Sequence, residues 1–207
     1  MGKHRGSVDS LVLSRIRDAG QGWVFTPGDL YDLGSRDAVA TALKRHRAAG
    51  TIRQIARGLY DVPRTHPTLG AAFPTVDSVA EAIRRRDSVR LQPSGAYAAN
   101  LLGLSDQVPT RVVFLTDGPQ RTIPLGKLEI LFRHTTPRNM ATAGRVSGSV
   151  VQALRWLGRR NVTERTVRHL RGLLDSDARR SLLSDRRYAP VWIAEIIRRV
   201  AESEASK

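Results

Sequence analysis

The sequence has no cysteine among its 207 residues. This absence excludes disulfide bridges, thiolate zinc sites, iron–sulfur clusters and a cysteine nucleophile. No apolar run approaches the 18 residues of a membrane span, and the first residues are polar. Neither a membrane span nor an export signal is therefore predicted, and we expect a cytoplasmic protein with no membrane partner.

Lysine is also scarce, because arginine supplies 30 of the 34 basic residues. Only 19 acidic residues oppose them, which leaves a net charge of +15. The arginine bias has two explanations that the sequence leaves open: a GC-rich genome, or bidentate contacts to phosphate and guanine. Hydrophobic residues make up 41% of the chain, enough for a packed core, so the surplus charge makes a polyanion the first partner to consider.

The positive charge is concentrated in two parts of the chain. Residues 1–34 are neutral, with four basic and four acidic side chains, whereas residues 35–58 carry a net charge of +5. Residues 133–171 contain nine arginines against one glutamate, a net charge of +8. Each basic block therefore needs its own explanation.

The first block lies in a pattern of three helices and a hairpin. The expected elements are a helix from Val8 capped by Ser7 or Asp9, a strand at 23–25, a short helix from Pro27 to Gly34, a helix from Arg36 to about Ala49 between the Ser35 cap and Gly50, and a hairpin over 51–62. This order is typical of a winged helix-turn-helix, whose last helix enters the major groove of DNA. We predict such a domain over residues 1–63.

The last of these helices divides into an inward and an outward face. Val39, Ala42, Leu43 and His46 share the side that would pack inward. The predicted DNA contacts are Arg36, Ala40 and Thr41 as base readers, Lys44, Arg45 and Arg47 as phosphate contacts, and Arg53 and Arg57 on the wing. The competing interpretations are a solvated charged face and a winged helix that binds another protein.

The remaining chain predicts a linker at 64–74, an α+β domain at 75–201 and a polar tail at 202–207. Helices are expected over 77–86, 95–102, from Ser149, from Glu164 and over 189–201, the last burying Trp192, Ile196 and Val200. Strands are expected at 89–91, 111–116, 122–125 and 127–132. The fold class is therefore α+β, a winged helix-turn-helix followed by a mixed α/β C-terminal domain.

The chain resembles the AbiEi-type antitoxins, transcriptional regulators of bacterial abortive-infection toxin–antitoxin systems. The likeness runs from about Val8 to Val200 and rests on the order and spacing of several motifs: Gly50-Thr51-Ile52-Arg53, Arg57-Gly58-Leu59-Tyr60, Ser94-Gly95-Ala96-Tyr97-Ala98-Ala99-Asn100-Leu101-Leu102-Gly103-Leu104 and Val112-Val113-Phe114-Leu115-Thr116-Asp117-Gly118. It implies autorepression at inverted repeats in operator DNA, with a possible homodimer on the DNA. It also implies a C-terminal antitoxin domain and a nucleotidyltransferase-like toxin as functional partner.

The second basic block forms a secondary basic surface in this interpretation. Its residues are Arg145, Arg155, Arg159, Arg160, Arg165, Arg168 and Arg171. Arg155 and Arg159 are expected on one helical surface, as are Arg168 and Arg171. The surface could extend the DNA contact, which we prefer, meet an acidic toxin, touch RNA, or simply be solvated.

No catalytic motif is present. The sequence lacks an H-E-x-x-H zinc motif, a G-x-S-x-G elbow, a P-loop and the protein-kinase signatures, so we assign no catalytic residue, metal or cofactor. One enzymatic alternative remains, an atypical serine kinase that uses ATP and Mg²⁺ to phosphorylate the toxin; direct sequestration of the toxin is another. Asp117, Lys127 and Glu129 are the only grouping that the kinase alternative could use, although Asp117-Gly118 is also an ordinary turn.

Overall fold

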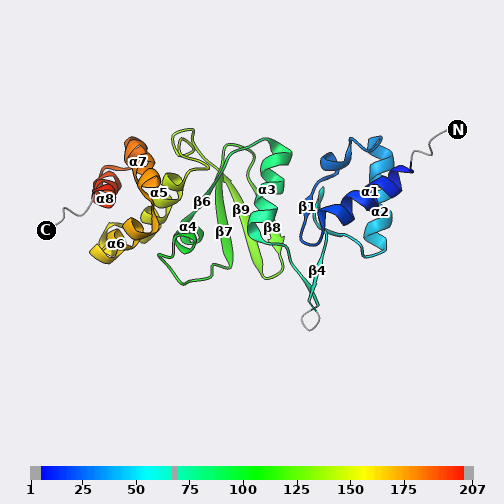
Figure 1. Ribbon diagram of the computed structural model, residues 1–207, viewed down its shortest axis with the longest axis horizontal. Coiled ribbons are helices and arrows are strands. Elements are labelled where there is room, and N and C mark those ends of the chain that lie inside the picture. Colours follow the sequence, from blue (N-terminus) through cyan, green and yellow to red (C-terminus); the bar gives the residue numbers. More distant parts are fainter. Residues whose placement is uncertain (1–5, 67–69, 203–207) are drawn as a thin grey trace. The chain divides into compact units, whose positions relative to one another are not determined.

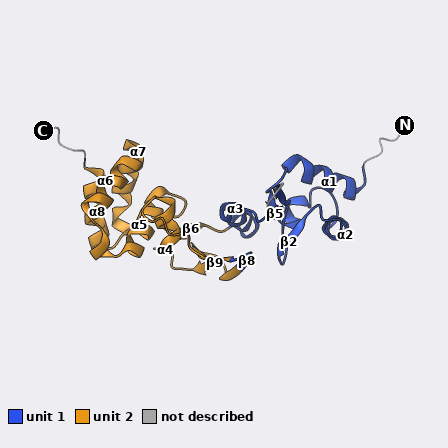
Figure 2. Ribbon diagram, turned by 90° about the horizontal axis from the view of Figure 1, so that it is seen from below, with its two compact units in different colours: residues 1–88, 123–127 blue, residues 89–122, 128–207 orange. Residues whose placement is uncertain are grey.

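The computed structural model describes residues 6–66 and 70–202 as a mixed α+β protein. The chain forms two compact units, the first comprising residues 1–88 and 123–127 and the second residues 89–122 and 128–207 (Figure 2). Among the described residues, no helix is both long and apolar enough to span a bilayer. The mixed α+β class expected from the sequence is confirmed.

Unit 1 begins with helices and a small antiparallel sheet (Figure 1). Its first elements are α1 (Val8–Ala19), β1 (Val24–Phe25), the 3₁₀ helix η1 (Pro27–Leu30), α2 (Arg36–Ala48), β2 (Arg53–Ala56) and β3 (Leu59–Asp61). β3 is the central strand and pairs antiparallel with both β1 and β2. The strand that ends the hairpin therefore also connects it to the strand that follows α1.

Short polar side chains fix where the helices of unit 1 begin. Ser7 and Ser35 accept hydrogen bonds from the backbone N–H groups of Ser10 and Ala38, and Asp29 accepts two from Thr26. At its other end α2 stops before Gly50, whose φ of 72° is the left-handed conformation that glycine adopts without strain. The helix boundaries thus follow local sequence signals. The core beneath them contains Val12, Ile16, Phe25, Leu30, Val39, Ala42, Leu43 and Ile52.

The segment interpreted as a linker contains a second hairpin. β4 (Arg64–His66) and β5 (Gly70–Ala72) pair antiparallel, and α3 (Val76–Asp87) follows in the same compact unit. Arg85 of α3 donates to the carbonyl of Val24 at 3.3 Å and lies 3.8 Å from the carboxylate of Asp29. These contacts place α3 with the N-terminal elements, and the first compact unit extends to Ser88. Residues 67–69 lie outside the described part of the chain, as do 203–207 of the predicted tail.

Unit 2 is built on strands β6 (Leu91–Ser94), β7 (Arg111–Thr116) and β9 (Leu128–His134). They belong to a sheet with the strand order β6-β7-β9-β8, where β8 spans Arg121–Leu125. β7 runs antiparallel to β6 and parallel to β9, with Phe114 opposite Phe132. These two rings stack at 5.7 Å between centroids, and Tyr97 meets Phe114 edge-on at 5.6 Å. Aromatic packing therefore fills the centre of the sheet.

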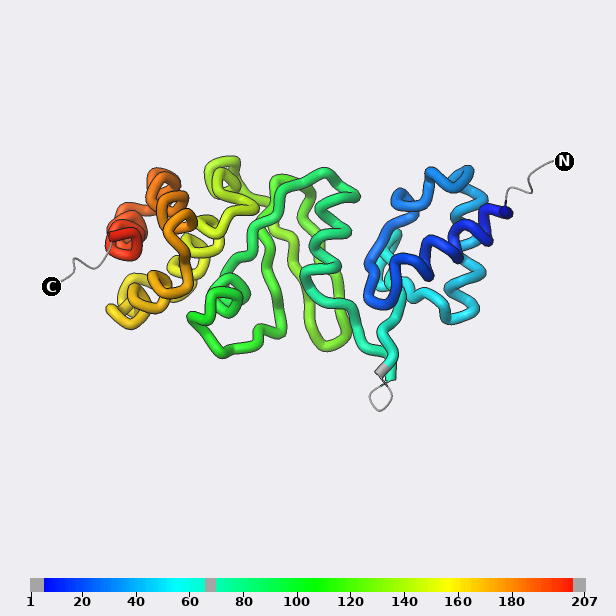
Figure 3. Tube along the Cα trace, in the orientation of Figure 1, coloured from blue at the N-terminus to red at the C-terminus, as the bar shows by residue number. Residues whose placement is uncertain are grey.

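The helices of unit 2 follow as α4 (Gly95–Leu101), α5 (Val146–Leu157), η2 (Arg159–Asn161), α6 (Glu164–Leu173), α7 (Ser176–Asp185), η3 (Arg186–Tyr188) and α8 (Val191–Ala201). α5 to α8 succeed one another toward the C-terminus (Figure 3, yellow to red). Three expectations differ: α5 begins before Ser149, α7 was not predicted, and α8 buries Ile193, Ile197 and Val200 while Trp192 and Ile196 are only partly buried. The predicted register of α8 was wrong because its apolar residues occupy more than one face.

A buried carboxylate connects α5 to α7. Asp185 is 3% exposed and accepts hydrogen bonds from the hydroxyl of Ser147 and, at 2.8 Å, from the guanidinium of Arg145. Ser147 is itself completely buried. A buried charge is tolerated only when it is paired and hydrogen-bonded, so these two partners make Asp185 compatible with the core.

We expect Asp185→Ala to lower the free energy of unfolding by about 2–3 kcal/mol, because it leaves a buried hydroxyl without its acceptor and Arg145 without its counter-ion. Urea denaturation followed by circular dichroism measures this loss. Asp177→Ala, in the same helix but at an exposed pair with Arg180, is the control and should cost less than about 1 kcal/mol. Equal losses from the two substitutions would contradict the role assigned to Asp185.

Candidate nucleic-acid interface

One surface of α2 faces solvent along its whole length. Val39, Ala42, Leu43 and His46 are buried on the opposite side, as their helical spacing predicts. Arg36, Ala40, Thr41, Lys44, Arg45 and Arg47 are all exposed. Because 3.6 residues make one turn, Asp37, Thr41, Lys44 and Ala48 lie on the side away from the buried residues, so one acid sits among the exposed basic groups. The exposed face therefore carries both short side chains and positive charges.

Contacts at its edges orient the longer side chains of α2. Arg47 donates to the side-chain oxygen of Gln54 on β2, so this edge of the helix adjoins the hairpin. Arg45 lies 3.8 Å from the carboxylate of Asp9, on the edge toward α1. Arg36 lies over the ring of Tyr31 at 5.3 Å from its centroid, a cation–π contact. Sequence reasoning missed Tyr31 and Gln54 because neither residue lies on α2, although each contacts an arginine of that helix.

His46 packs inside unit 1, as expected. The residue is 7% exposed, and its Nε2 lies 3.7 Å from Oδ1 of Asp9, a residue of α1. The imidazole is thus part of the contact between the two helices. It does not face the exposed surface of α2.

The hairpin places its two arginines in different surroundings. Arg57 is exposed beside Gly58, whose φ of 67° lets the chain turn between β2 and β3. The Arg53 guanidinium instead makes a two-point ion pair with Asp61, at 3.0 and 2.6 Å, and donates to the carbonyl of Ala72 at 2.9 Å. It also lies 4.6 Å from the ring centroid of Phe73. Arg53 therefore already has its partners within unit 1. Arg57, in contrast, has no ion-pair partner among the described residues.

The secondary basic surface is less uniform than its sequence suggests. Arg145 pairs with Asp185, and Arg171 is half-buried with a hydrogen bond to the carbonyl of Arg199. α5 ends at Leu157, so Arg155 and Arg159 do not share one helical surface; Arg159 lies in η2. That expectation is corrected, because Gly158, with a φ of 76°, separates the two elements. Arg159, Arg160, Arg165 and Arg168 are the exposed members that lie beyond α5.

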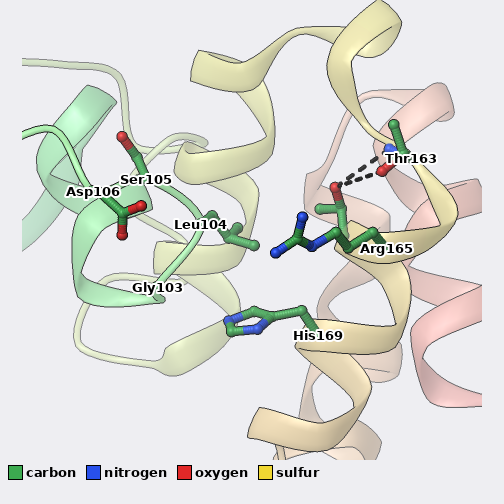
Figure 4. A pocket seen from close by; sticks show the side chains of 8 residues that line it. Gly103, Leu104, Ser105, Asp106, Thr163, Arg165 and His169 are labelled. Carbon is green, nitrogen blue, oxygen red and sulfur yellow. Dashed lines mark hydrogen bonds between the residues drawn. The ribbon is translucent and has the colours of Figure 1, made fainter.

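A pocket of about 300 Å³ contains one of these arginines (Figure 4). Arg165 and His169 reach into it from α6, facing the loop that carries Leu104 and Asp106. The ring of His169 is hydrogen-bonded to the carbonyl of Leu102 at 2.8 Å. Because Asp106 and Arg165 both line the pocket, their charges offset each other. This pocket therefore gives an anion no net electrostatic preference.

The grouping considered for an enzyme is not brought together. Asp117 follows the end of β7, whereas Glu129 is paired in register with Arg111 at its beginning. Six strand residues span roughly 20 Å, too far for the two carboxylates to share one site. Each also has an arginine partner at 2.8 Å, Arg90 for Asp117 and Arg111 for Glu129. Within residues 6–66 and 70–202, no three potential ligand side chains gather as a metal site.

Residues 11–182 match a protein family described as a family of unknown function, DUF6088. The match extends over parts of both compact units. No curated protein matches the sequence. The family description assigns no activity, so the functional argument depends on the residues themselves.

The contacts of Asp117 make a prediction for its titration. Partial burial alone would raise the pKa of this carboxyl, but hydrogen bonds from the side chain and backbone of Arg90 outweigh burial and lower it. Since the folded pKa is lowered, Asp117 stabilises the fold above its ordinary pKa, and this contribution is lost as the pH falls through the lowered value. We expect Arg90→Met to raise the pKa of Asp117, as measured by carboxyl-carbon NMR. Arg111→Met is the control; a similar rise with Arg111→Met would contradict the assignment.

Proposed function

The chain belongs to the DUF6088 family, and from its own residues we propose that it is a DNA-binding regulator with an N-terminal winged helix-turn-helix. In this proposal α2 is the recognition helix and the β2–β3 hairpin is the wing. Double-stranded operator DNA is the partner of this unit. The observation that carries the proposal is the exposed, positively charged outer face of α2 beside a hairpin with a free arginine at its tip.

The order of the elements supports this assignment. Helix α1, strand β1, the short η1, helix α2 and the β2–β3 hairpin follow one another as in winged helices, although η1 is only one 3₁₀ turn. β3 lies between β1 and β2, which holds the wing against the strand following α1. α2 packs on α1 through its apolar side. This arrangement leaves one face of α2 available to a groove.

The chemistry of the exposed residues suggests a division of roles. Ala40 and Thr41 are small enough to let the helix approach base edges closely, and a methyl or hydroxyl group can meet thymine or a base acceptor. Arg36 and Lys44 bring positive charge to either end of that segment. Arg45, Arg47 and Arg57 are placed for phosphates, which fix the position of the protein without reading sequence. Arg53 stabilises the wing in this proposal and does not contact DNA.

We further propose that the regulator is the antitoxin of a toxin–antitoxin pair, as its likeness to AbiEi-type antitoxins implies. Two copies would then occupy an inverted repeat upstream of the operon, because the symmetry of the protein follows that of its operator. The second unit would counteract a nucleotidyltransferase-like toxin. The support for this part is the resemblance in sequence motifs, which extends into unit 2.

The DNA proposal predicts the effect of Arg36→Gln combined with Lys44→Gln. Affinity for DNA from the region upstream of the gene should fall roughly tenfold or more, with a weaker dependence on salt concentration because phosphate contacts are lost. Fluorescence anisotropy over a salt series measures both quantities. The control is Arg17→Gln, which removes an exposed arginine of α1 and should change the affinity little. Unchanged affinity in the double variant would remove α2 as the recognition helix.

The antitoxin proposal predicts a result for the partner protein. When the chain is co-expressed with a nucleotidyltransferase-like toxin from the same operon, cells should survive a toxin dose that is otherwise lethal. Intact-mass spectrometry of the recovered toxin separates the mechanisms, since phosphorylation adds mass and sequestration does not. Co-elution with an unchanged mass would support sequestration. Failure to protect cells would contradict the antitoxin role while leaving DNA binding to be judged by its own experiment.

A further inference from the structure

A second pocket of unit 2, of about 360 Å³, lies at the carboxyl ends of β7 and β9. These strands are parallel neighbours, with Leu115 opposite Arg133, and both residues line the pocket. α5 contributes Gln152, Arg155 and Trp156 from the other side. The carboxyl ends of parallel strands are where open sheets commonly bind ligands, because loops and helix ends converge there without blocking the sheet edge.

The pocket has positive charge and no carboxylate. Arg133 and Arg155 line it, no acidic residue does, and neither arginine has an ion-pair partner among the described residues. The hydrogen bond of Arg155 goes to the neutral side-chain oxygen of Asn139, at 3.1 Å. Burial, and next the charge of nearby Arg138, lower the pKa of Arg155. Arg155 is thus held partly out of solvent and beside the cation of Arg138, so a bound anion would stabilise its charge.

An aromatic ring lies beside these cations. Trp156 is 40% exposed, whereas Trp23 stacks on Phe25 at 4.3 Å and Trp192 packs against the C-terminal core. Trp156 is therefore the tryptophan with an available surface. An exposed indole next to arginines offers a stacking platform together with a phosphate contact, the combination by which proteins hold a nucleotide unit.

A buried polar pair completes the lining. Gln152, which is 6% exposed, uses its side-chain oxygen to accept a hydrogen bond from Ser94 at 3.2 Å. No described residue accepts a hydrogen bond from its amide nitrogen, and this nitrogen keeps contact with solvent. A solvent-accessible donor on a residue that lines the pocket can donate to a ligand without first giving up a partner in the protein. This donor gives the pocket a directional contact besides charge and stacking.

We propose that this pocket binds a nucleoside phosphate, with the base on Trp156, the phosphate between Arg133 and Arg155, and the amide of Gln152 donating to the base or sugar. The volume lies in the range of small-ligand sites. The same chemistry has two sources, a free nucleotide or one nucleotide of a single strand. The residues of this pocket all belong to unit 2, so they differ from the unit 1 residues assigned to operator DNA.

Isothermal titration of the full chain with adenosine 5′-monophosphate tests this assignment. The unmodified protein should bind one equivalent, and Trp156→Leu should weaken binding about tenfold, while Trp156→Phe, which keeps an aromatic face, should lose less. Arg133→Gln combined with Arg155→Gln should weaken it at least as much. Arg198→Gln removes an exposed charge of α8, outside the pocket and outside the secondary basic surface, and should leave the affinity unchanged. Circular dichroism and the urea midpoint verify that each variant folds.

A second titration, with an eight-nucleotide oligodeoxyadenylate, distinguishes the two sources. Binding that is tighter than that of the mononucleotide and sensitive to Trp156→Leu would assign the pocket to a single strand, and equal or weaker binding would assign it to a free nucleotide. No saturable binding of the mononucleotide would overturn the proposal. The proposal is also overturned if inorganic phosphate competes as well as the mononucleotide, or if Arg198→Gln weakens mononucleotide binding as much as the pocket variants do.

Discussion

The ion pair between Arg53 and Asp61 is the constraint on which the arrangement of unit 1 depends. Asp61 is 1% exposed, and a carboxylate in that position is stable only because a guanidinium meets it at two points. The same guanidinium reaches the carbonyl of Ala72 and the ring of Phe73. One side chain thereby joins β2 to β3 and both to the end of β5, which fixes the position of the β2–β3 hairpin.

This pair shows that positive charge in this chain serves two purposes. Arg53, Arg85 and Arg145 are held by carboxylates or carbonyls and support the fold. The exposed arginines around α2, on η2 and along α6 have no such ion pairs or hydrogen bonds, or have only exposed ion pairs that contribute little to stability. The net charge of +15 is therefore a poor measure of the charge available to a polyanion. What matters is which guanidinium groups the fold has already used.

The two proposed binding sites follow from different structural principles. The face of α2 is a convex surface suited to a groove, and its short residues Ala40 and Thr41 allow close approach. The pocket beside β9 is concave, and it combines Arg133 from β9 with Trp156 and Gln152 from α5, the next element of the chain. An extended duplex fits the first and a single nucleotide unit fits the second. A regulator with both sites could read an operator through one unit and a nucleotide through the other.

The sequence by itself determined the local elements. Ser7, Ser35 and Gly50 set the ends of α1 and α2 because caps and left-handed glycines act within one turn, and apolar spacing identified the buried side of α2. Apolar periodicity did not identify the buried face of α8, because apolar residues lie on more than one side of that helix. It did not reveal α7 at all, because that helix is rich in polar residues. The outward residues of α2 were therefore predictable, whereas the surroundings of each arginine were not.

Only the tertiary structure decided which charges are paired and which residues share a site. Arg53 finds Asp61 across a strand pair, Arg145 finds Asp185 forty positions away, and Asp117 and Glu129 lie at opposite ends of β7 despite their closeness in sequence. Arg133 and Trp156 line one pocket because the end of β9 and the helix α5, which packs against β6, both border it. Such contacts depend on strand order and helix packing, which join residues over distances that no local pattern encodes.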